Sequence, residues 1–236
     1  HTINKRRIFK IANVYFACSQ VAAKWFFGNK AAKIMVNGID LEHYKYNPEI
    51  RKQIRLQYDL QDEFVIGHVG RFGIEKNHKK LLNVFAACKK VQPKVKLILC
   101  GDGEERKNIE DEIKRLNIEK DVLLLGVVYN VNEILQAMDI FVMPSLFEGL
   151  PFSLLEAQAT GLQCIVSDTV SLESDITGWN QFLPLNLDNE LWADAILNLE
   201  RVNDREKGYE ILKKSGFDIA DCKNEVEKLI DTKLDK

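Results

Sequence analysis

Two glutamates, Glu148 and Glu156, have the residue type and spacing for chemistry at a helix start. They lie eight positions apart within residues 144–159, one in a predicted loop and one in the second turn of a predicted helix. Pro151 suits the first position of that helix, so the free backbone amides around Gly149 would face a bound anion. A buried carboxylate at Glu156 is costly without a partner. That partner is either an internal hydrogen-bond donor or the hydroxyl groups of a ligand.

Two cations follow an earlier glycine-containing turn. Arg71 and Lys76 lie within residues 70–80, close to another predicted helix start. An arginine can bind a phosphate through two parallel hydrogen bonds, a lysine adds a point charge, and the helix start adds the positive end of its dipole. This combination is typical of a phosphate site. The lysines of this stretch could equally form a solvated helix face, so composition leaves both interpretations open.

Two further loops carry weaker patterns. Residues 100–104, with the sequence Cys-Gly-Asp-Gly-Glu, form a tight turn before a helix. Turn chemistry is the more frequent role of such a motif than contact with a ligand. Residues 126–130 include Val128 and Asn130, and the backbone of this loop could contact a nucleobase.

Alternating elements would bring these loops together. Short apolar runs alternate with amphipathic helical stretches, which predicts an α/β fold with a Rossmann-like doubly wound parallel sheet and helices on both faces. Continuous apolar runs at 97–99 and 123–125 predict burial of both faces of the sheet. Ligands of such sheets bind at the carboxyl ends of the strands, where the loops converge. The predicted strands comprise residues 64–70, 95–100, 122–125, 139–143 and 163–166.

The two ends of the chain lie outside this alternation. Residues 37–40 are typical of a turn or hinge, and Asp218 is the expected N-cap of a last helix. A basic cluster near the start suits either a solvated helix face, which we favour, or contact with a membrane surface. The cluster consists of Lys5, Arg6, Arg7 and Lys10, and it precedes strand candidates at 14–18 and 34–36 and a helix candidate at 21–27.

The composition excludes several classes of protein. Of the 236 residues, 46% are hydrophobic and 29% charged, as in globular rather than disordered or collagenous chains. A formal net charge of -2 provides no overall positive field for nucleic acid. The five scattered cysteines form neither a disulfide framework nor a zinc motif, which fits a reducing cytosol. No apolar run reaches the roughly 20 residues of a spanning helix, and a first residue other than methionine indicates a piece of a longer protein.

Several ordered motifs resemble one family. Residues 144–159, with two glutamates separated by seven residues, are similar to the donor-binding half of retaining GT-B glycosyltransferases of the family 4 group, also called glycosyl transferases group 1. Residues 69–71 (Val-Gly-Arg) and Lys76 match the same pattern. The resemblance runs from about residue 12 to residue 200 and is nearest to bacterial capsular and exopolysaccharide enzymes. Further motifs in the same order are residues 37–40, 101–103 and 159–162.

The resemblance implies the C-terminal half of a GT-B fold, with remnants of its N-terminal domain. Residues 1–40 would be a remnant of the acceptor domain together with the hinge. Residues 41–217 would form the nucleotide-sugar-binding domain, and residues 218–236 the helix that crosses back to the other half.

On the phosphate side, the resemblance implies that Arg71 and Lys76 hold the donor diphosphate. They would act in catalysis by neutralising the charge that develops on the leaving group. The backbone amides of Gly149 and Leu150 would add to that site. No Asp-x-Asp motif is present, which fits a reaction that requires no metal ion and no cofactor.

On the sugar and nucleoside side, the resemblance implies that Glu148 binds hydroxyl groups of the donor sugar. Glu148 would then be a positioning residue of catalysis rather than a covalent nucleophile. Glu156 would bind the ribose hydroxyls, and Val128 and Asn130 would lie beside the nucleobase.

The implied reaction is the transfer of a hexosyl group, with retention, from a nucleotide-diphospho-sugar, with a UDP-sugar favoured. The acceptor would be a glycan or a lipid-linked molecule in bacterial surface polysaccharide synthesis. The full-length enzyme would work in the cytoplasm, at the inner face of the membrane. This chain alone would transfer little, because positioning needs both walls of the cleft.

Three alternatives remain open. The first is a non-catalytic nucleotide-sugar-binding subunit that needs a partner chain. The second is a related GT-B phosphorylase or epimerase, although no lysine stands out as the attachment point of a pyridoxal cofactor. The third is an α/β domain without a ligand, which would require the four charged residues Arg71, Lys76, Glu148 and Glu156 to converge at the strand ends by accident.

Overall fold

The computed structural model describes residues 9, 11, 12 and 14–234. Within them, six parallel strands form one sheet in the order β5-β4-β3-β6-β7-β8. The chain therefore moves outward in one direction from β3 and then restarts at β6 in the other direction, which is the doubly wound arrangement. The strands are β3 (Phe64–Val69), β4 (Val95–Cys100), β5 (Val122–Gly126), β6 (Ile140–Met143), β7 (Cys164–Ser167) and β8 (Gln181–Leu183).

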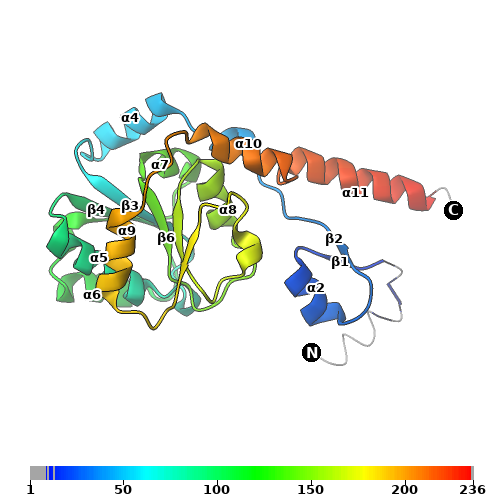
Figure 1. Cartoon of the computed structure of the whole chain (residues 1–236), viewed down its shortest axis with the longest axis horizontal. Helices are drawn as coiled ribbons and strands as arrows, with labels where there is room; N and C mark the ends of the chain where they lie inside the picture. Colours follow the sequence, from blue (N-terminus) through cyan, green and yellow to red (C-terminus); the bar gives the residue numbers. More distant parts are fainter. Residues whose placement is uncertain (1–8, 10, 13, 235–236) are drawn as a thin grey trace.

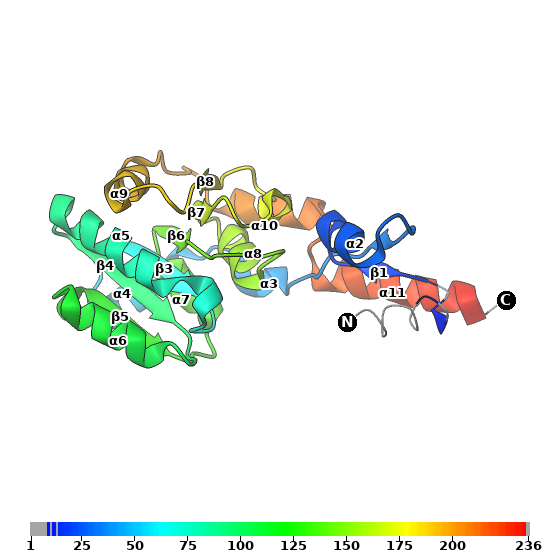
Figure 2. The same cartoon turned by 90° about the horizontal axis from the view of Figure 1, so that it is seen from below.

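Helices cover both faces of the sheet (Figures 1 and 2). Successive strand residues point to opposite faces, so Leu97 and Leu99 of β4 join one core cluster, whereas Ile98 joins the other. The first cluster packs against α5 (His78–Val91), α6 (Arg106–Arg115) and α9 (Asn189–Asn198). The second packs against α4 (Pro48–Gln57), α7 (Val131–Ala137) and α8 (Phe152–Ala159). This arrangement confirms the predicted Rossmann-like fold.

The sheet differs from the prediction at its two edges. Residues 97–99 are fully buried as expected. Residues 123–125 are covered on both faces, with Leu124 against the first cluster and Leu123 and Leu125 against the second, but they are only partly buried. The reason is that β5 pairs with β4 alone and forms one edge. The opposite edge is β8, which the prediction of five strands missed because it has three residues and only one, Leu183, is buried.

A third core cluster joins α8 to two helices that the strand pattern did not predict. They are α3 (Leu41–Tyr44) and α10 (Glu206–Lys214). Leu41 packs there with Leu155 and Ala159 of α8. Helix α8 begins at Phe152, so Pro151 is its N-cap and not its first helical residue as predicted.

Both ends of the described chain lie at the same end of the molecule, apart from the sheet (Figures 1 and 2). There the strands β1 (Phe16–Ala17) and β2 (Lys33–Ile34) pair in parallel and are connected through α2 (Gln20–Phe27), and the last helix is α11 (Ile219–Leu234). The Asp218 carboxylate accepts a hydrogen bond from the Ala220 amide at 3.0 Å, which confirms the predicted N-cap. The basic cluster at residues 5–10 lies outside the described residues.

Candidate functional site

The candidate site lies where the sheet changes direction. Strands β3 and β6 are neighbours, but their following helices, α5 and α8, cover opposite faces. The loops after these two strands therefore lead to opposite faces, and doubly wound sheets bind ligands in the crevice outside the carboxyl ends at this point. The backbones of the two loops are joined by a hydrogen bond from the Leu146 amide to the Glu75 carbonyl at 2.7 Å.

Lys76 and Glu148 meet across this crevice. The Lys76 Nζ lies 2.7 Å from the Glu148 Oε1, and the two side chains are only 12% and 19% exposed. Lys76 ends a short 3-10 helix, η1 (Ile74–Lys76), and the Glu148 carbonyl accepts a hydrogen bond from the Ser171 amide. The loop after β3 thus positions Lys76, and the loop after β6 positions Glu148. The structure brings together two of the residues predicted from the sequence.

Arg71 lies in a different environment. Its Nη2 donates to both carboxylate oxygens of Glu104 at 2.8 Å, and the two side chains are 67% and 49% exposed. An exposed ion pair of this kind is weak. Arg71 can therefore leave Glu104 for a stronger anion at little cost.

The turn at residues 100–104 serves to pack two loops together. The Phe72 amide donates to the Asp102 carbonyl, and the Phe72 carbonyl accepts from the Glu105 amide, each at 2.9 Å. Gly101 has a φ of +143°, and a Cβ there would lie 1.9 Å from the Gly70 carbonyl oxygen. This close approach requires glycine, and the turn contributes Glu104 as the partner of Arg71.

The start of α8 is open. A Cβ placed on Gly149 would have no atom within 4 Å, and within the described structure no side chain caps the first turn of α8. Gly149 is exposed, while Leu150 is partly buried against the third core cluster. The first amides of this helix are consequently free to face an anion.

Glu156 and Tyr44 border the same hollow. Burial raises the pKa of the Glu156 carboxyl, and a hydrogen bond from the Tyr44 hydroxyl opposes that rise. Both side chains line a hollow of about 500 Å³ that also contacts Tyr129 and Asn132. Because Glu156 borders this hollow, a ligand placed there could reach its carboxylate.

The loop after β5 forms another wall of this hollow. Val128 is partly buried against the second core cluster, and the exposed Asn130 donates to the Glu133 carboxylate at 2.8 Å. Tyr129 stands between them with its side chain fully exposed. The two flanking residues were predicted to lie beside the nucleobase and Tyr129 was missed, although a tyrosine in a loop after a strand can stack against a flat ligand.

A pair of buried histidines lies behind Lys76. His68 of β3 donates from Nδ1 to the Val142 carbonyl at 2.9 Å, and its ring meets that of His78 edge-on, 5.0 Å between centroids. Burial lowers the pKa of both imidazoles, to about 4 for His78, and the Lys76 charge adds to this effect. Both rings are therefore neutral near pH 7. A histidine within the apolar run 64–70 was a signal that the sequence analysis did not use.

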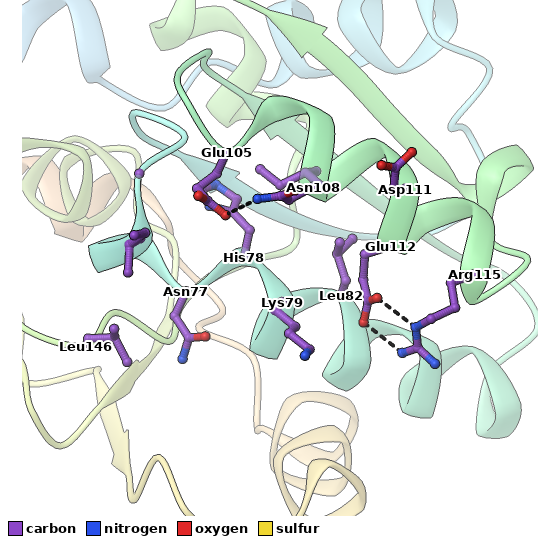
Figure 3. A pocket seen from close by; sticks show the side chains of 13 residues that line it. Asn77, His78, Lys79, Leu82, Glu105, Asn108, Asp111, Glu112, Arg115 and Leu146 are labelled. Atoms are coloured by element: carbon purple, nitrogen blue, oxygen red, sulfur yellow. Dashed lines mark hydrogen bonds and ion pairs between the residues drawn. The ribbon is translucent and has the colours of Figure 1, made fainter.

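A further hollow, of about 480 Å³, lies between α5 and α6 (Figure 3). Its polar side chains bind one another: Arg115 donates to Glu112 at 2.7 Å, and Asn108 donates to Glu105 at 3.0 Å. None of the site residues predicted from the sequence lines this hollow.

Two features are absent from the described residues. Among them, no group of three or more His, Cys, Asp or Glu side chains could hold a metal ion. No helix in the same part of the chain has both the length and the apolar character to cross a bilayer.

Comparison with known proteins decides the family. The sequence pattern described as glycosyl transferases group 1 matches residues 50–215. The chain belongs to this family. The match lies within residues 41–217 and includes every residue predicted to bind the donor.

Two relatives from bacteria align with most of the chain. It is 37% identical over 199 residues to EpsF of Bacillus subtilis (strain 168), a glycosyltransferase by name, in an alignment that covers 81% of this chain and 52% of EpsF. It is 32% identical over 201 residues to the UDP-Gal:alpha-D-GlcNAc-diphosphoundecaprenol alpha-1,3-galactosyltransferase of Escherichia coli, covering 77% of this chain and 51% of that enzyme. The chain thus spans about half the length of these relatives.

Solved structures agree with the fold. Anabaena HepE, crystallised in complex with UDP, superimposes with a TM-score of 0.84 at 20% identity, covering 98% of this chain and 67% of HepE. The HepE complex with UDP-glucose superimposes with a TM-score of 0.82 at 21% identity, covering 98% of this chain and 67% of that one.

Proposed function

We propose that this chain is the donor-binding part of a glycosyltransferase that uses a nucleoside-diphosphate sugar, with uridine as the base. The observation that carries the proposal is the shielded Lys76–Glu148 pair at the point where the sheet changes direction. A cation and a carboxylate held side by side there suit a ligand with a diphosphate next to a hydroxyl-rich sugar.

The relatives support the choice of base. The name of the Escherichia coli enzyme specifies UDP-galactose as its donor. The HepE structures contain UDP and UDP-glucose. A uridine nucleotide is therefore the first ligand to test.

On the phosphate side, we assign Lys76 and Arg71 to the diphosphate. Lys76 is already in the crevice, and Arg71 would exchange the carboxylate of Glu104 for a phosphate. The amides of Gly149 and Leu150 at the start of α8 would add hydrogen bonds. Together they would stabilise the negative charge that develops on the leaving diphosphate, which needs no metal ion.

On the sugar and nucleoside side, Glu148 would accept hydrogen bonds from hydroxyl groups of the donor sugar and so position it against Lys76. Glu156 would accept hydrogen bonds from the ribose hydroxyls. Val128 and Asn130 would border the nucleobase at the edge of the hollow. These assignments join the crevice and the hollow into one elongated donor site.

The proposed reaction transfers a hexosyl group with retention. The bond from the anomeric carbon to the diphosphate oxygen breaks, and a bond to the acceptor oxygen forms on the same face of the sugar. The acceptor proton passes to the leaving phosphate. We propose a glycan or lipid-linked acceptor in surface polysaccharide synthesis, bound mainly by a preceding domain of the full-length protein at the inner face of the membrane.

Thermal unfolding with UDP, GDP and ADP tests the donor site. A ligand at about 100 times its dissociation constant adds about 2.7 kcal/mol to the stability of the folded chain. We expect UDP to raise the melting temperature of the wild-type chain and to have little effect on Glu156→Ala. Glu105→Ala, in the hollow between α5 and α6, is the matched control and should keep the full response. No response to any of the three nucleotides would contradict the proposal.

A further inference from the structure

His68 is a buried side chain behind the candidate site that none of the assignments above uses. It lies in β3, it is fully buried, and its ring stacks on that of Phe141 with 5.9 Å between centroids. Its Nδ1 donates to the Val142 carbonyl at 2.9 Å. A carbonyl oxygen can only accept, so this bond places the proton of the neutral imidazole on Nδ1 and leaves Nε2 as an acceptor.

This acceptor has no donor. The Nε2 atom is buried, and no donor among the residues that the structure describes forms a hydrogen bond with it. The ring of His78 meets the His68 ring edge-on, but both of its nitrogens are likewise without a hydrogen bond to the described chain. A buried acceptor without a donor costs free energy, so an unpaired group of this kind needs a physical reason.

The side chain of Lys76 passes through the space next to this acceptor. Gly70 follows β3, and a Cβ placed on it would lie 3.3 Å from the His68 Nε2 and 3.1 Å from the Lys76 Cε. Both atoms thus border the same point beside the glycine. The Lys76 Nζ is one bond beyond Cε and lies 2.7 Å from the Glu148 Oε1. Lys76 therefore has a carboxylate at its tip and an unused acceptor beside its last carbon.

A bound diphosphate would change the partners of Lys76. An ammonium group has three N–H donors, and a diphosphate in the crevice would compete with Glu148 for them. A second carboxylate near Lys76 would cancel the charge that stabilises the leaving diphosphate. A neutral acceptor such as the His68 Nε2 can instead hold one N–H of Lys76 and leave that charge intact.

We propose that His68 is a positioning residue for the diphosphate site: when Lys76 turns from Glu148 to the diphosphate of the donor, the His68 Nε2 accepts one hydrogen bond from the Lys76 ammonium and holds it in the crevice. The inference rests on the proposed donor site and adds the residue that supports its lysine. His68 itself does not touch the donor. It acts through Lys76.

The first test is spectroscopic and uses the wild-type chain. The ring nitrogens of labelled histidines are observed by ¹⁵N NMR, and the His68 signals are assigned by their loss in His68→Gln. Without UDP, we expect a protonated Nδ1 and a bare Nε2. With saturating UDP, the Nε2 signal should move toward that of a hydrogen-bonded acceptor, and the His78 signals, the internal control, should move less. A His68 Nε2 signal that bound UDP leaves unchanged would overturn the proposal.

The second test compares His68→Gln with His68→Asn. The glutamine amide reaches the position of Nε2 and can still accept from Lys76, but it gives up the bond to Val142. The shorter asparagine amide reaches the position of Nδ1 and keeps the bond to Val142, but it offers no acceptor at Nε2. By calorimetry, His68→Gln should bind UDP within about threefold of the wild type, and His68→Asn about tenfold more weakly, because a hydrogen bond to a charged group is lost.

Stability should follow the opposite order. Urea unfolding should find His68→Asn more stable than His68→Gln, since only asparagine keeps the bond to the Val142 carbonyl. If UDP affinity follows stability instead, His68 has a structural role alone and the proposal is overturned. If either variant fails to fold, the ¹⁵N measurement on the wild type decides.

These outcomes also separate the inference from the donor site. If the wild type does not bind UDP, the donor site proposal fails, and the inference about His68 fails with it. If the wild type binds UDP, but its Nε2 signal stays unchanged or both variants bind as tightly as the wild type, the donor site stands and only the role of His68 is overturned.

Discussion

At the scale of single residues, the two cations of the proposed diphosphate site differ in how they are held. Lys76 forms a shielded pair with Glu148, and Arg71 forms an exposed pair with Glu104. Removing one partner of a shielded pair leaves a poorly solvated charge, whereas an exposed pair contributes little. Substitution of Lys76 should therefore lower the stability of the chain, whereas substitution of Arg71 should not.

Lys76→Met and Arg71→Ala test this difference by urea unfolding with and without UDP. We expect Lys76→Met to lower the free energy of unfolding by about 1–3 kcal/mol, because Glu148 loses its partner. Arg71→Ala should leave the free energy of unfolding without UDP unchanged. Both variants should lose most of the stabilisation by UDP. A full UDP response in either variant would remove that residue from the diphosphate site.

The buried histidines predict a pH dependence of stability. The pKa of His78 falls from 6.5 to about 4 in the folded chain because burial disfavours the imidazolium. Between these pH values the unfolded chain binds more protons than the folded one, so stability falls as the pH falls. The contribution of His78 is complete above about pH 6.5, and about 3 kcal/mol is lost by about pH 4.

The variant His78→Phe should remove this loss. Urea unfolding is measured between about pH 7.5 and about pH 4.5, which covers most of the range in which His78 changes its charge. Over this range the free energy of unfolding should fall less in His78→Phe than in the wild type. His43→Phe is the control, because the His43 side chain is exposed and its removal should leave the wild-type decline. Equal declines in all three chains would show that His78 is not a buried neutral group.

At the scale of elements, the loops after β3 and β4 act as one packed unit. Hydrogen bonds from residues 70–72 to the turn at residues 100–105 hold them together, and the turn allows this approach because Gly101 and Gly103 have no side chains. A Cβ on Gly103 would lie 2.5 Å from the Phe72 carbonyl oxygen. The position of Arg71 therefore depends on a turn from the neighbouring strand.

Gly101→Ala and Gly149→Ala compare a packed glycine with an open one. Gly101→Ala should lower the free energy of unfolding by about 2 kcal/mol or more, because of the positive φ and the contact with the Gly70 carbonyl. Gly149→Ala should change it by less than about 0.5 kcal/mol, and its methyl group should weaken UDP binding by filling the space at the start of α8. Urea unfolding and calorimetry measure the two effects, and a stable Gly101→Ala chain would contradict the packing argument.

The sequence was sufficient to predict the strands that are buried and continuous, and with them the edge of the sheet that carries the site. Residues 97–99 can be recognised as a strand in the sequence because three apolar residues in a row need two covered faces. The strand β8 cannot be recognised in this way, because an edge strand of three residues needs few apolar side chains. Pattern analysis also misses α3, a helix of four residues held by packing against α8.

The same limit applies to the site. Lys76 and Glu148 were predicted because each follows a strand, and strand ends converge in a parallel sheet. Glu104, the partner of Arg71, was missed, because this contact joins loops that are far apart in the sequence. No local spacing encodes such a contact, and it becomes visible only when the elements are packed.

At the scale of the whole molecule, we expect the proposed donor site to form one wall of a cleft in the full-length protein. Phe147 and Phe152 flank the start of α8, with side chains 67% and 48% exposed. Glu148 and Gly149 lie between them in the sequence. The alignments extend over about half of EpsF and of the galactosyltransferase, so their remaining halves are available to form an opposite wall.

We expect this chain to bind the donor without transferring its sugar. Transfer depends on holding donor and acceptor in reactive geometry, and intramolecular positioning of this kind can contribute about 7–11 kcal/mol to catalysis. The chain should therefore bind UDP-galactose or UDP-glucose by calorimetry, yet transfer no measurable sugar to a diphosphoundecaprenol-linked saccharide. The Escherichia coli galactosyltransferase, assayed at full length with its own substrates, is the positive control. Turnover by this chain at a comparable rate would mean that residues 41–217 and their flanking segments already contain the acceptor site, and that a second wall is not required.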